Sequence, residues 1–259
     1  MRKQIAALTI LSLPATASAS ALGVGFGAGY DYWTASPSGG MADSEIDIDI
    51  DDDLSMEDSK EGQMWAYLEH PLPIIPDARI QKGRVASEGS GGEFDFTLST
   101  DFGDFTDSIS DIDSSFEMDM TDFIVYWSPL PENLLTLGIL SLDVGVNYRT
   151  ISGELYMEGE EDGAGSTLTV DKSFNAPVPM GYGSLRANIP GTGVSLGGAI
   201  STLSVGGNEF TDTTMDISWR SPFGLGVRGG VRTLDLVIDE DIEFDMSFNG
   251  AFLGAFYQF

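Results

Sequence analysis

The chain has 259 residues and no cysteine, and its 41 acidic and 12 basic residues give a formal charge of -29. The lack of cysteine excludes disulfide frameworks and thiolate metal sites. The excess of carboxylates opposes phosphate binding, so nucleic acid is not an expected partner. Most acidic residues gather in four segments, which predict acidic loops between less charged strands. The segments run from Asp43 to Glu61, Asp101 to Asp122, Glu154 to Asp162 and Asp235 to Asp245.

The N-terminus has the layout of a secretory signal. Two basic residues precede the apolar run from Ile5 to Leu13, and small residues follow from Ala15 to Ala21. We therefore expect residues 1–21 to be a cleaved signal peptide and residues 22–259 to form one domain. The apolar run is too short to cross a hydrocarbon core of ~30 Å as a helix, so a membrane-bound mature chain must span as strands. A soluble secreted or periplasmic protein is the alternative.

The first segment of the expected mature chain alternates strictly. One face carries Leu22, Val24, Phe26, Ala28, Tyr30 and Tyr32, and the other carries Gly23, Gly25, Gly27, Gly29, Asp31 and Trp33. A period of two indicates a β-strand. The length suits a transmembrane strand, which needs ~9–11 residues when tilted. We expect the apolar face to contact lipid and the glycine-rich face to line a lumen.

Later segments repeat this alternation and place charges on the face that we assign to the interior. Leu142, Val144, Val146 and Tyr148 alternate with Asp143, Gly145, Asn147 and Arg149. We expect a polar lumen network formed by Asp143, Arg149, Asp216, Arg220, Arg228 and Arg232. The alternative is the polar exterior of a soluble sandwich. On the lumen assignment, Val144→Arg and Val146→Arg should impair folding more than Gly145→Ser.

Turn chemistry favours a membrane barrel. Short proline-containing connections alternate with longer ones, as in outer-membrane barrels with short periplasmic turns and longer external loops. The sequence predicts an all-β fold, a transmembrane antiparallel up-and-down β-barrel of about ten strands, with eight or twelve as alternatives. The expected strands lie near residues 22–33, 62–70, 78–88, 116–127, 140–157, 174–188, 193–204, 210–220, 224–238 and 243–259. Aromatic residues at Trp65, Tyr67, Tyr126, Trp127, Tyr148, Trp219 and Tyr257 are candidates for interfacial girdles or for lumen filling.

The last segment alternates again and ends on an aromatic residue, with Leu253, Tyr257 and Phe259 on one face. This ending resembles the C-terminal assembly signal of outer-membrane β-barrels, which implies delivery to the barrel-assembly machinery and a last strand that closes against the first. Further segments of interest are Leu68-Glu69-His70-Pro71, Ser141-Leu142-Asp143-Val144-Gly145-Val146 and Phe252-Leu253-Gly254-Ala255-Phe256-Tyr257-Gln258-Phe259. Through them the chain resembles a family of small Gram-negative outer-membrane β-barrel proteins. The resemblance implies a location and a fold and supplies no catalytic residue.

Catalytic and metal chemistry have few candidates. His70 is the only histidine, and it stands beside Pro71 in an expected periplasmic turn, so we expect no catalytic residue and no cofactor. Asp47, Asp49, Asp51 and Asp53 are weak candidates for divalent-ion binding. Their alternation with isoleucine is typical of a strand extension, and a solvated acidic loop is the other interpretation. We expect the segment from Asp43 to Lys60 to be dispensable for folding.

These observations favour a non-enzymatic outer-membrane β-barrel protein with acidic extracellular loops and a structural, surface-interaction or narrow-pore role. Wide aqueous channels require ~16–18 strands, so a general porin is disfavoured. The alternatives are a soluble periplasmic or secreted ligand-binding β-barrel and an outer-membrane enzyme. The expected partners are outer-membrane lipid, lipopolysaccharide, the barrel-assembly machinery and, for the acidic loops, divalent cations.

Overall fold

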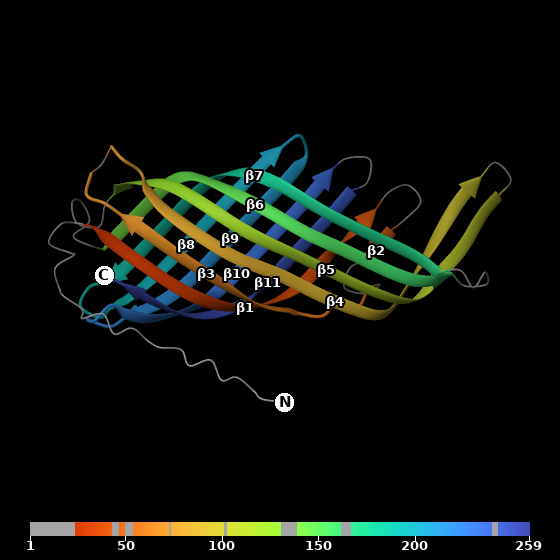
Figure 1. Ribbon diagram of the computed structural model, residues 1–259, viewed down its shortest axis with the longest axis horizontal. Helices are drawn as coiled ribbons and strands as arrows, with labels where there is room; N and C mark the ends of the chain where they lie inside the picture. The colour runs from red at the N-terminus through yellow and green to blue at the C-terminus, as the bar shows by residue number, and fades with distance from the viewer. Residues whose placement is uncertain are drawn as a thin grey trace, which may run out of the picture.

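The computed structural model describes residues 24–42, 47–49, 54–72, 74–100, 103–130, 139–161, 167–239 and 243–259 (Figure 1). The predicted signal peptide therefore lies outside the described residues. The strands are β1 (Gly25–Ala42), β2 (Asp47–Asp49), β3 (Ser59–Glu69), β4 (Asp77–Thr100), β5 (Gly103–Leu130), β6 (Leu140–Glu161), β7 (Thr167–Ile189), β8 (Val194–Val205), β9 (Asn208–Arg220), β10 (Leu225–Asp239) and β11 (Glu243–Gln258). In this part of the chain no helix is long and apolar enough to cross a membrane.

Ten of these strands close into an antiparallel barrel. Neighbours in sequence are neighbours in the sheet, and β11 pairs with β1 to complete the ring. Phe26 and Phe259 finish this seam by exchanging two backbone hydrogen bonds of 3.0 and 2.9 Å. The short β2 pairs with the end of β1 that lies beyond β3. Where all ten strands are paired, closure leaves no sheet edge, so this part of the wall can satisfy its backbone groups inside lipid. The predicted up-and-down barrel of ten strands is confirmed.

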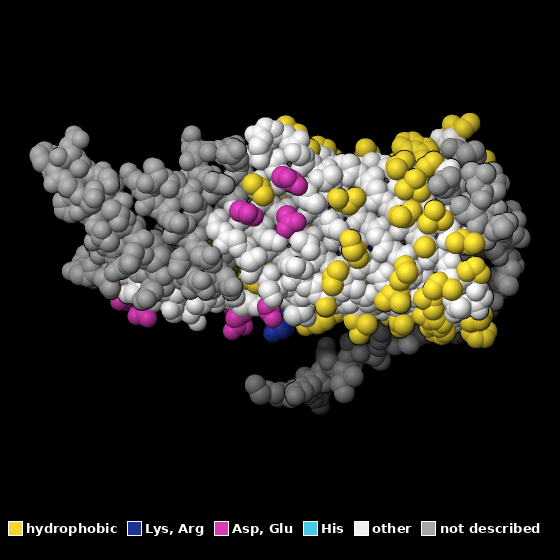
Figure 2. All heavy atoms as spheres, turned by 180° about the vertical axis from the view of Figure 1, so that it is seen from behind, with side chains coloured by type: hydrophobic (Ala, Val, Ile, Leu, Met, Phe, Trp, Pro, Cys, Tyr) yellow, Lys and Arg dark blue, Asp and Glu magenta, His cyan; other side chains and the backbone are white. Residues whose placement is uncertain are grey.

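Exposed apolar side chains on the strands form a belt around one part of the barrel, and Figure 2 shows one face of this belt. Its exposed members include Phe26, Tyr30, Tyr32, Met64, Leu68, Ile80, Phe123, Trp127, Val144, Val146, Tyr148, Leu185, Ile200, Met215, Ile217, Trp219, Leu225, Val227, Val231 and Leu253. An outward apolar band is the mark of a barrel that stands in a bilayer. Residues that the sequence assigned to the lipid face of β1 and β6 lie in the belt, so those face assignments are confirmed for the described residues; they are Phe26, Tyr30, Tyr32, Val144, Val146 and Tyr148. Leu22 lies outside the described residues.

Four neighbouring strands are much longer than a membrane crossing needs. β4, β5, β6 and β7 contain 24, 28, 22 and 23 residues, against the ~9–11 that span a bilayer. They continue past the other strands at one end of the barrel (Figure 1). The acidic segment from Asp101 to Asp122, expected to be a loop, is therefore strand from Gly103 onward. Its carboxylates alternate with buried apolar residues such as Phe116 and Met118, and this period of two outweighs the high charge.

The inner wall changes from polar to apolar where the belt ends. On five strands, consecutive inward side chains switch from a buried charge to a buried hydrophobe: Asp31 to Trp33, Asp122 to Met120, Arg149 to Ile151, Asp212 to Phe210, and Arg232 to Leu234. The outward positions change beside them, from the apolar belt to Thr34, Thr121, Thr150, Thr213 and Thr233. We call the level of these five outward threonines the threonine level, and we call the side that carries the belt the lower side. Below the threonine level the barrel is apolar outside and mainly polar inside. Above it the polarity is inverted and is that of a barrel in water.

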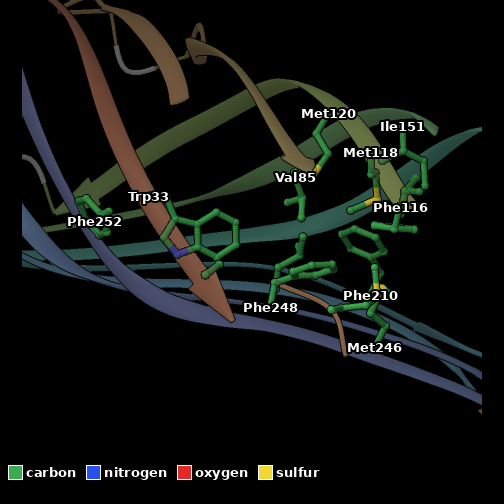
Figure 3. Packing of buried hydrophobic residues seen from close by; sticks show 14 of the residues in the cluster. Trp33, Val85, Phe116, Met118, Met120, Ile151, Phe210, Met246, Phe248 and Phe252 are labelled. Carbon is green, nitrogen blue, oxygen red and sulfur yellow. The ribbon is translucent and has the colours of Figure 1, made fainter. Parts of the chain in front are cut away.

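Buried hydrophobic residues fill the barrel above the threonine level (Figure 3). The rings of Phe116 and Phe248 stack with centroids 5.7 Å apart, and Val85, Met118 and Leu234 pack into the same cluster. Each buried side chain of this size contributes about 1.5–3 kcal/mol relative to exposure. The projecting part of the barrel therefore has a hydrophobic core of its own.

The expected aromatic girdle divides between the two faces of the wall. Trp127, Tyr148 and Trp219 are exposed in the belt. Trp65 and Tyr126 instead are buried inside, because they share a face with the inward residues of β3 and β5. Residue type alone does not separate a girdle aromatic from a lumen aromatic, whereas its phase within the strand does.

Candidate functional site: the polar barrel interior

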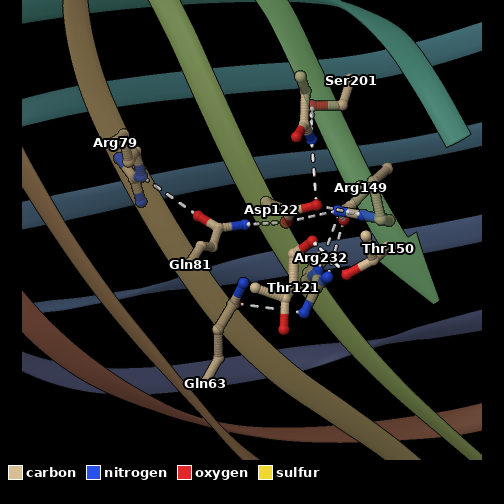
Figure 4. Close-up of polar contacts among 11 residues, drawn as sticks. Gln63, Arg79, Gln81, Thr121, Asp122, Arg149, Thr150, Ser201 and Arg232 are labelled. Atoms are coloured by element: carbon tan, nitrogen blue, oxygen red, sulfur yellow. Dashed lines mark hydrogen bonds and ion pairs between the residues drawn. The ribbon is translucent and has the colours of Figure 1, made fainter. Parts of the chain in front are cut away.

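The centre of the polar interior is an arginine held between two aspartates (Figure 4). Arg149 on β6 is 1% exposed. Its Nη2 donates to Asp122 Oδ2 at 2.9 Å and to Asp212 Oδ2 at 2.5 Å. Asp122 is the direct cross-strand neighbour of Arg149 on β5, whereas Asp212 reaches it from β9. The guanidinium therefore joins strands that are distant in the sheet.

A second arginine shares one of these carboxylates. Arg232 on β10 donates to both oxygens of Asp212, at 3.0 and 2.7 Å, and to Gln63 Oε1 on β3 at 3.2 Å. Bidentate contacts of this kind fix geometry as well as charge. Because two arginines face two aspartates here, the central group formed by Asp122, Arg149, Asp212 and Arg232 is electrically balanced.

Two further ion pairs line the same interior. Arg228 Nε donates to Asp31 Oδ1 at 2.8 Å, which joins β10 to β1 across the closing strand. Arg186 Nη2 lies 3.2 Å from Asp216 Oδ1. Asp143 instead accepts hydrogen bonds from two serine hydroxyls, those of Ser128 at 2.7 Å and Ser184 at 3.3 Å.

The structure thus places five of the six predicted lumen residues inside the barrel. Asp216 pairs with Arg186, and among the described residues Asp143 forms no ion pair with an arginine. The sixth, Arg220, is exposed where β9 ends.

Three network members, Asp122, Arg186 and Asp212, were not among the predicted lumen residues, whereas Asp31 was placed on the lumen face of the first strand but not in the network. Asp122 ends the segment expected to be an acidic loop but also lies in the expected strand 116–127, where it is in phase with the inward residues of β5. Asp212 is in phase with Asp216, and this signal was available in the sequence. The contact between Asp212 and Arg149 depends on how the closed barrel brings β9 opposite β6, which no local pattern records.

The only histidine lies in the turn between β3 and β4. Its Nδ1 accepts a hydrogen bond from the Leu72 N–H at 3.1 Å, and its Nε2 lies 3.2 Å from Pro76 O. The backbone N–H of His70 donates to Asp77 Oδ1 at 2.8 Å. Both ring nitrogens are therefore engaged with backbone atoms of the turn, an arrangement that shapes the connection.

The acidic candidates for divalent-ion binding are only partly described. Asp47 and Asp49 belong to β2 and pair with Ala42 and Gly40 of β1, while Asp51 and Asp53 lie outside the described residues. Within the described ranges no three histidine or carboxylate side chains form a group that could hold a metal ion. Ion binding by this segment stays a prediction.

The residues of the predicted assembly signal lie on the closing strand. Leu253 is 70% exposed on the outer face. The ring of Phe259 contacts those of Tyr257 and Phe26 at centroid distances of 5.7 and 5.5 Å. The C-terminal residue therefore packs across the seam between β11 and β1.

No family model matches the sequence, and no curated protein matches it. Among solved structures, the chain is similar to the outer-membrane protease OmpT from Escherichia coli, with a TM-score of 0.52 and 11% identity over 91% of this chain and 97% of that one. Ail of Yersinia pestis gives a TM-score of 0.36 and 8% identity over 91% and 99% of the two chains. The transport unit of the autotransporter AIDA-I from Escherichia coli gives 0.39 and 11% over 91% and 90%. At such identities the likeness concerns the fold alone. The likeness to OmpT shows that this chain has the fold of an outer-membrane β-barrel, and the apolar belt agrees with a barrel that stands in a bilayer.

Proposed function

We propose that this protein is a non-enzymatic outer-membrane barrel with a closed interior, and that the wall of β4 to β7 beyond the membrane is its interaction surface. The filled interior is the observation that carries the proposal. Ion pairs occupy the membrane level, the hydrophobic cluster occupies the level above, and a cavity between polar side chains has a volume of only about 60 Å³. A barrel filled in this way supports a structural or surface role better than a porin-like one.

The projecting wall offers a polar and mainly acidic outer face. Asp113, Glu117, Asp119, Glu154 and Glu158 are exposed on β5 and β6, and Figure 2 shows acidic side chains beyond the apolar belt. Rigid strands hold these groups at fixed spacing, which suits contact with cationic or cation-bridged partners. Divalent cations are therefore proposed as bridging partners.

Lipopolysaccharide is the proposed lipid partner at the outer boundary of the belt. Lys60 is the cross-strand neighbour of Thr34, and Lys82 is the cross-strand neighbour of Thr121. Both lysines are exposed, at the level where the belt ends. Long basic side chains at such a boundary can extend to lipid phosphates.

The barrel-assembly machinery is the proposed partner for insertion. This proposal rests on the aromatic residue Phe259 at the C-terminus, which resembles the assembly signal of outer-membrane barrels.

Conductance tests the closed interior. The purified protein, inserted into a planar bilayer, should give no stable channel, while a general porin in the same bilayer serves as the positive control. Stable openings of porin size would overturn the proposal.

Labelling in intact cells tests which end of the barrel lies outside the cell. The described chain has no cysteine, so single cysteines report cleanly. Ser152 is exposed on the projecting part of β6, and Pro222 is exposed in the turn between β9 and β10. A membrane-impermeant maleimide should label Ser152→Cys in intact cells, and Pro222→Cys only after permeabilisation. The reverse pattern would place the projecting wall in the periplasm.

A further inference from the structure

A small cavity lies within the polar interior. It has a volume of about 60 Å³ and is lined by residues from seven strands, β3, β4, β5, β7, β8, β9 and β10. Its wall contains the arginines Arg79, Arg186 and Arg228, the carboxylates Asp212 and Asp216, and the hydroxyls of Ser201 and Thr214. One water molecule needs roughly 10–15 Å³ of such space. The cavity can therefore hold a small ion together with water.

One arginine of this cavity forms no ion pair with another described residue. Arg186 is paired with Asp216 and Arg228 with Asp31. Arg79 meets no carboxylate within ion-pair distance in the described part of the chain, and its Nε donates to Gln81 Oε1 at 3.2 Å (Figure 4). Gln81 is neutral, so the contacts of Arg79 among the described residues include no carboxylate partner.

The surroundings of Arg79 hold it in place without neutralising it. Its guanidinium carbon lies 4.9 Å from the centre of the Trp65 ring, and that of Arg228 lies 5.0 Å from the same ring. Trp65 Nε1 donates to Asp31, the carboxylate already paired with Arg228. A ring face attracts a cation but leaves its charge in place. A charge inside a membrane-level lumen is costly unless an opposite charge meets it.

We propose that this cavity binds a small inorganic anion of halide size, with the Arg79 guanidinium as its principal ligand. Ser201 accepts a hydrogen bond from Asn147 Nδ2 at 3.1 Å, so its own hydroxyl proton is available to the anion. The Thr214 hydroxyl at the cavity wall is a second such donor. The bound anion pairs with Arg79 and connects it to β8 and β9. This site is independent of the outer wall.

Bromide is the probe, because it scatters anomalously and resembles chloride in size and charge. A crystal of the whole protein soaked in bromide should show an anomalous peak within hydrogen-bond distance of Arg79. The absence of a peak there would overturn the proposal, whatever peaks occur on the outer surface.

Thermal unfolding in detergent, at constant ionic strength, gives a second test. Replacing gluconate by bromide should raise the unfolding temperature of the wild type along a saturable curve. Arg79→Gln should abolish this rise, while Arg220→Gln, a matched change at an exposed arginine, should keep it. A rise of equal size in Arg79→Gln, or a linear response without saturation in all three proteins, would count against the site.

Discussion

Arg149 and Asp122 face each other across β5 and β6, and the guanidinium donates to both carboxylate oxygens while it also reaches Asp212 on β9. The three side chains are nearly inaccessible to solvent. A single arginine thus connects two sides of the barrel at the level where the inner wall changes from polar to apolar. Without Arg149, the central group would contain two aspartates, Asp122 and Asp212, and only one arginine, Arg232.

We expect Arg149→Met to lower the free energy of unfolding by about 3–5 kcal/mol, because it leaves a buried carboxylate uncompensated. Urea titration of the protein in lipid vesicles measures this. Arg84→Met is the matched control, since Arg84 pairs with Glu117 at a partly exposed site, where such pairs contribute about 0–1 kcal/mol. Equal losses in the two variants would show that the central ion pairs do not stabilise the barrel.

Val146→Arg should lower stability by ~2–4 kcal/mol, because Val146 lies in the belt and an arginine there must enter hydrocarbon. Glu154→Arg is the control: it is on the same outer face of β6 but beyond the threonine level, and it should insert normally. Heat-modifiable migration on gels distinguishes folded from unfolded protein. Impaired insertion of Glu154→Arg to the same degree would contradict the boundary.

The sequence-based ranking that made Gly145→Ser the mild change needs revision. A Cβ atom at Gly145 would lie 2.1 Å from the Val125 carbonyl oxygen and 2.7 Å from Tyr126 Cα. Both atoms are backbone, so the neighbouring strand would have to move. We expect Gly145→Ser to reduce the yield of folded barrel substantially, measured by the same gel shift. Wild-type yield would show that β5 can move away.

Some of these structural features could be predicted from the sequence and others could not. The lipid-facing side chains of β1 and β6 could be predicted, because outward and inward positions alternate along these strands and their outer faces are mainly apolar. The length of β5 was missed, since its carboxylates resemble a loop. Contacts across the lumen, such as Arg149 with Asp212, depend on barrel closure and strand stagger. The close approach at Gly145 depends on backbone atoms of another strand.

Replacing Phe259 by Asp should leave export intact but block barrel assembly. The ring packs across the seam against Phe26, and the backbone of the same residue completes the pairing of β11 with β1. Fractionation and heat-modifiability separate exported from assembled protein. Membrane-integrated, heat-modifiable Phe259→Asp protein would remove the C-terminus from the assembly signal.

The acidic segment after β1 should be dispensable only in part. Leu54 and Met56 are buried in the core cluster, and Ser59 accepts a hydrogen bond from the Ala86 N–H. Deletion of residues 43–53 with a short Gly/Ser joint should therefore insert normally, whereas deletion of residues 43–60 should be less stable because two buried side chains are lost. Equal stability of the two deletions would exclude a packing role for Leu54 and Met56.

Calcium tests the divalent-ion hypothesis for the same segment. The hypothesis predicts that millimolar calcium raises the unfolding temperature of the intact protein more than that of the protein lacking residues 43–53. An equal response in both proteins would remove Asp47, Asp49, Asp51 and Asp53 as the ion site.

The most direct test of the inverted polarity is a spin-label scan along the outer face of β6 in lipid vesicles. Labels at positions 144, 146 and 148 should collide with dissolved oxygen, because these residues lie in the belt, and labels at 152, 154 and 156 should collide with a water-soluble nickel complex. Along the strand, the response should change from oxygen to nickel at position 150, which lies at the threonine level. A strand that responds to nickel throughout, or to oxygen throughout, would contradict a barrel that is half in the membrane and half above it.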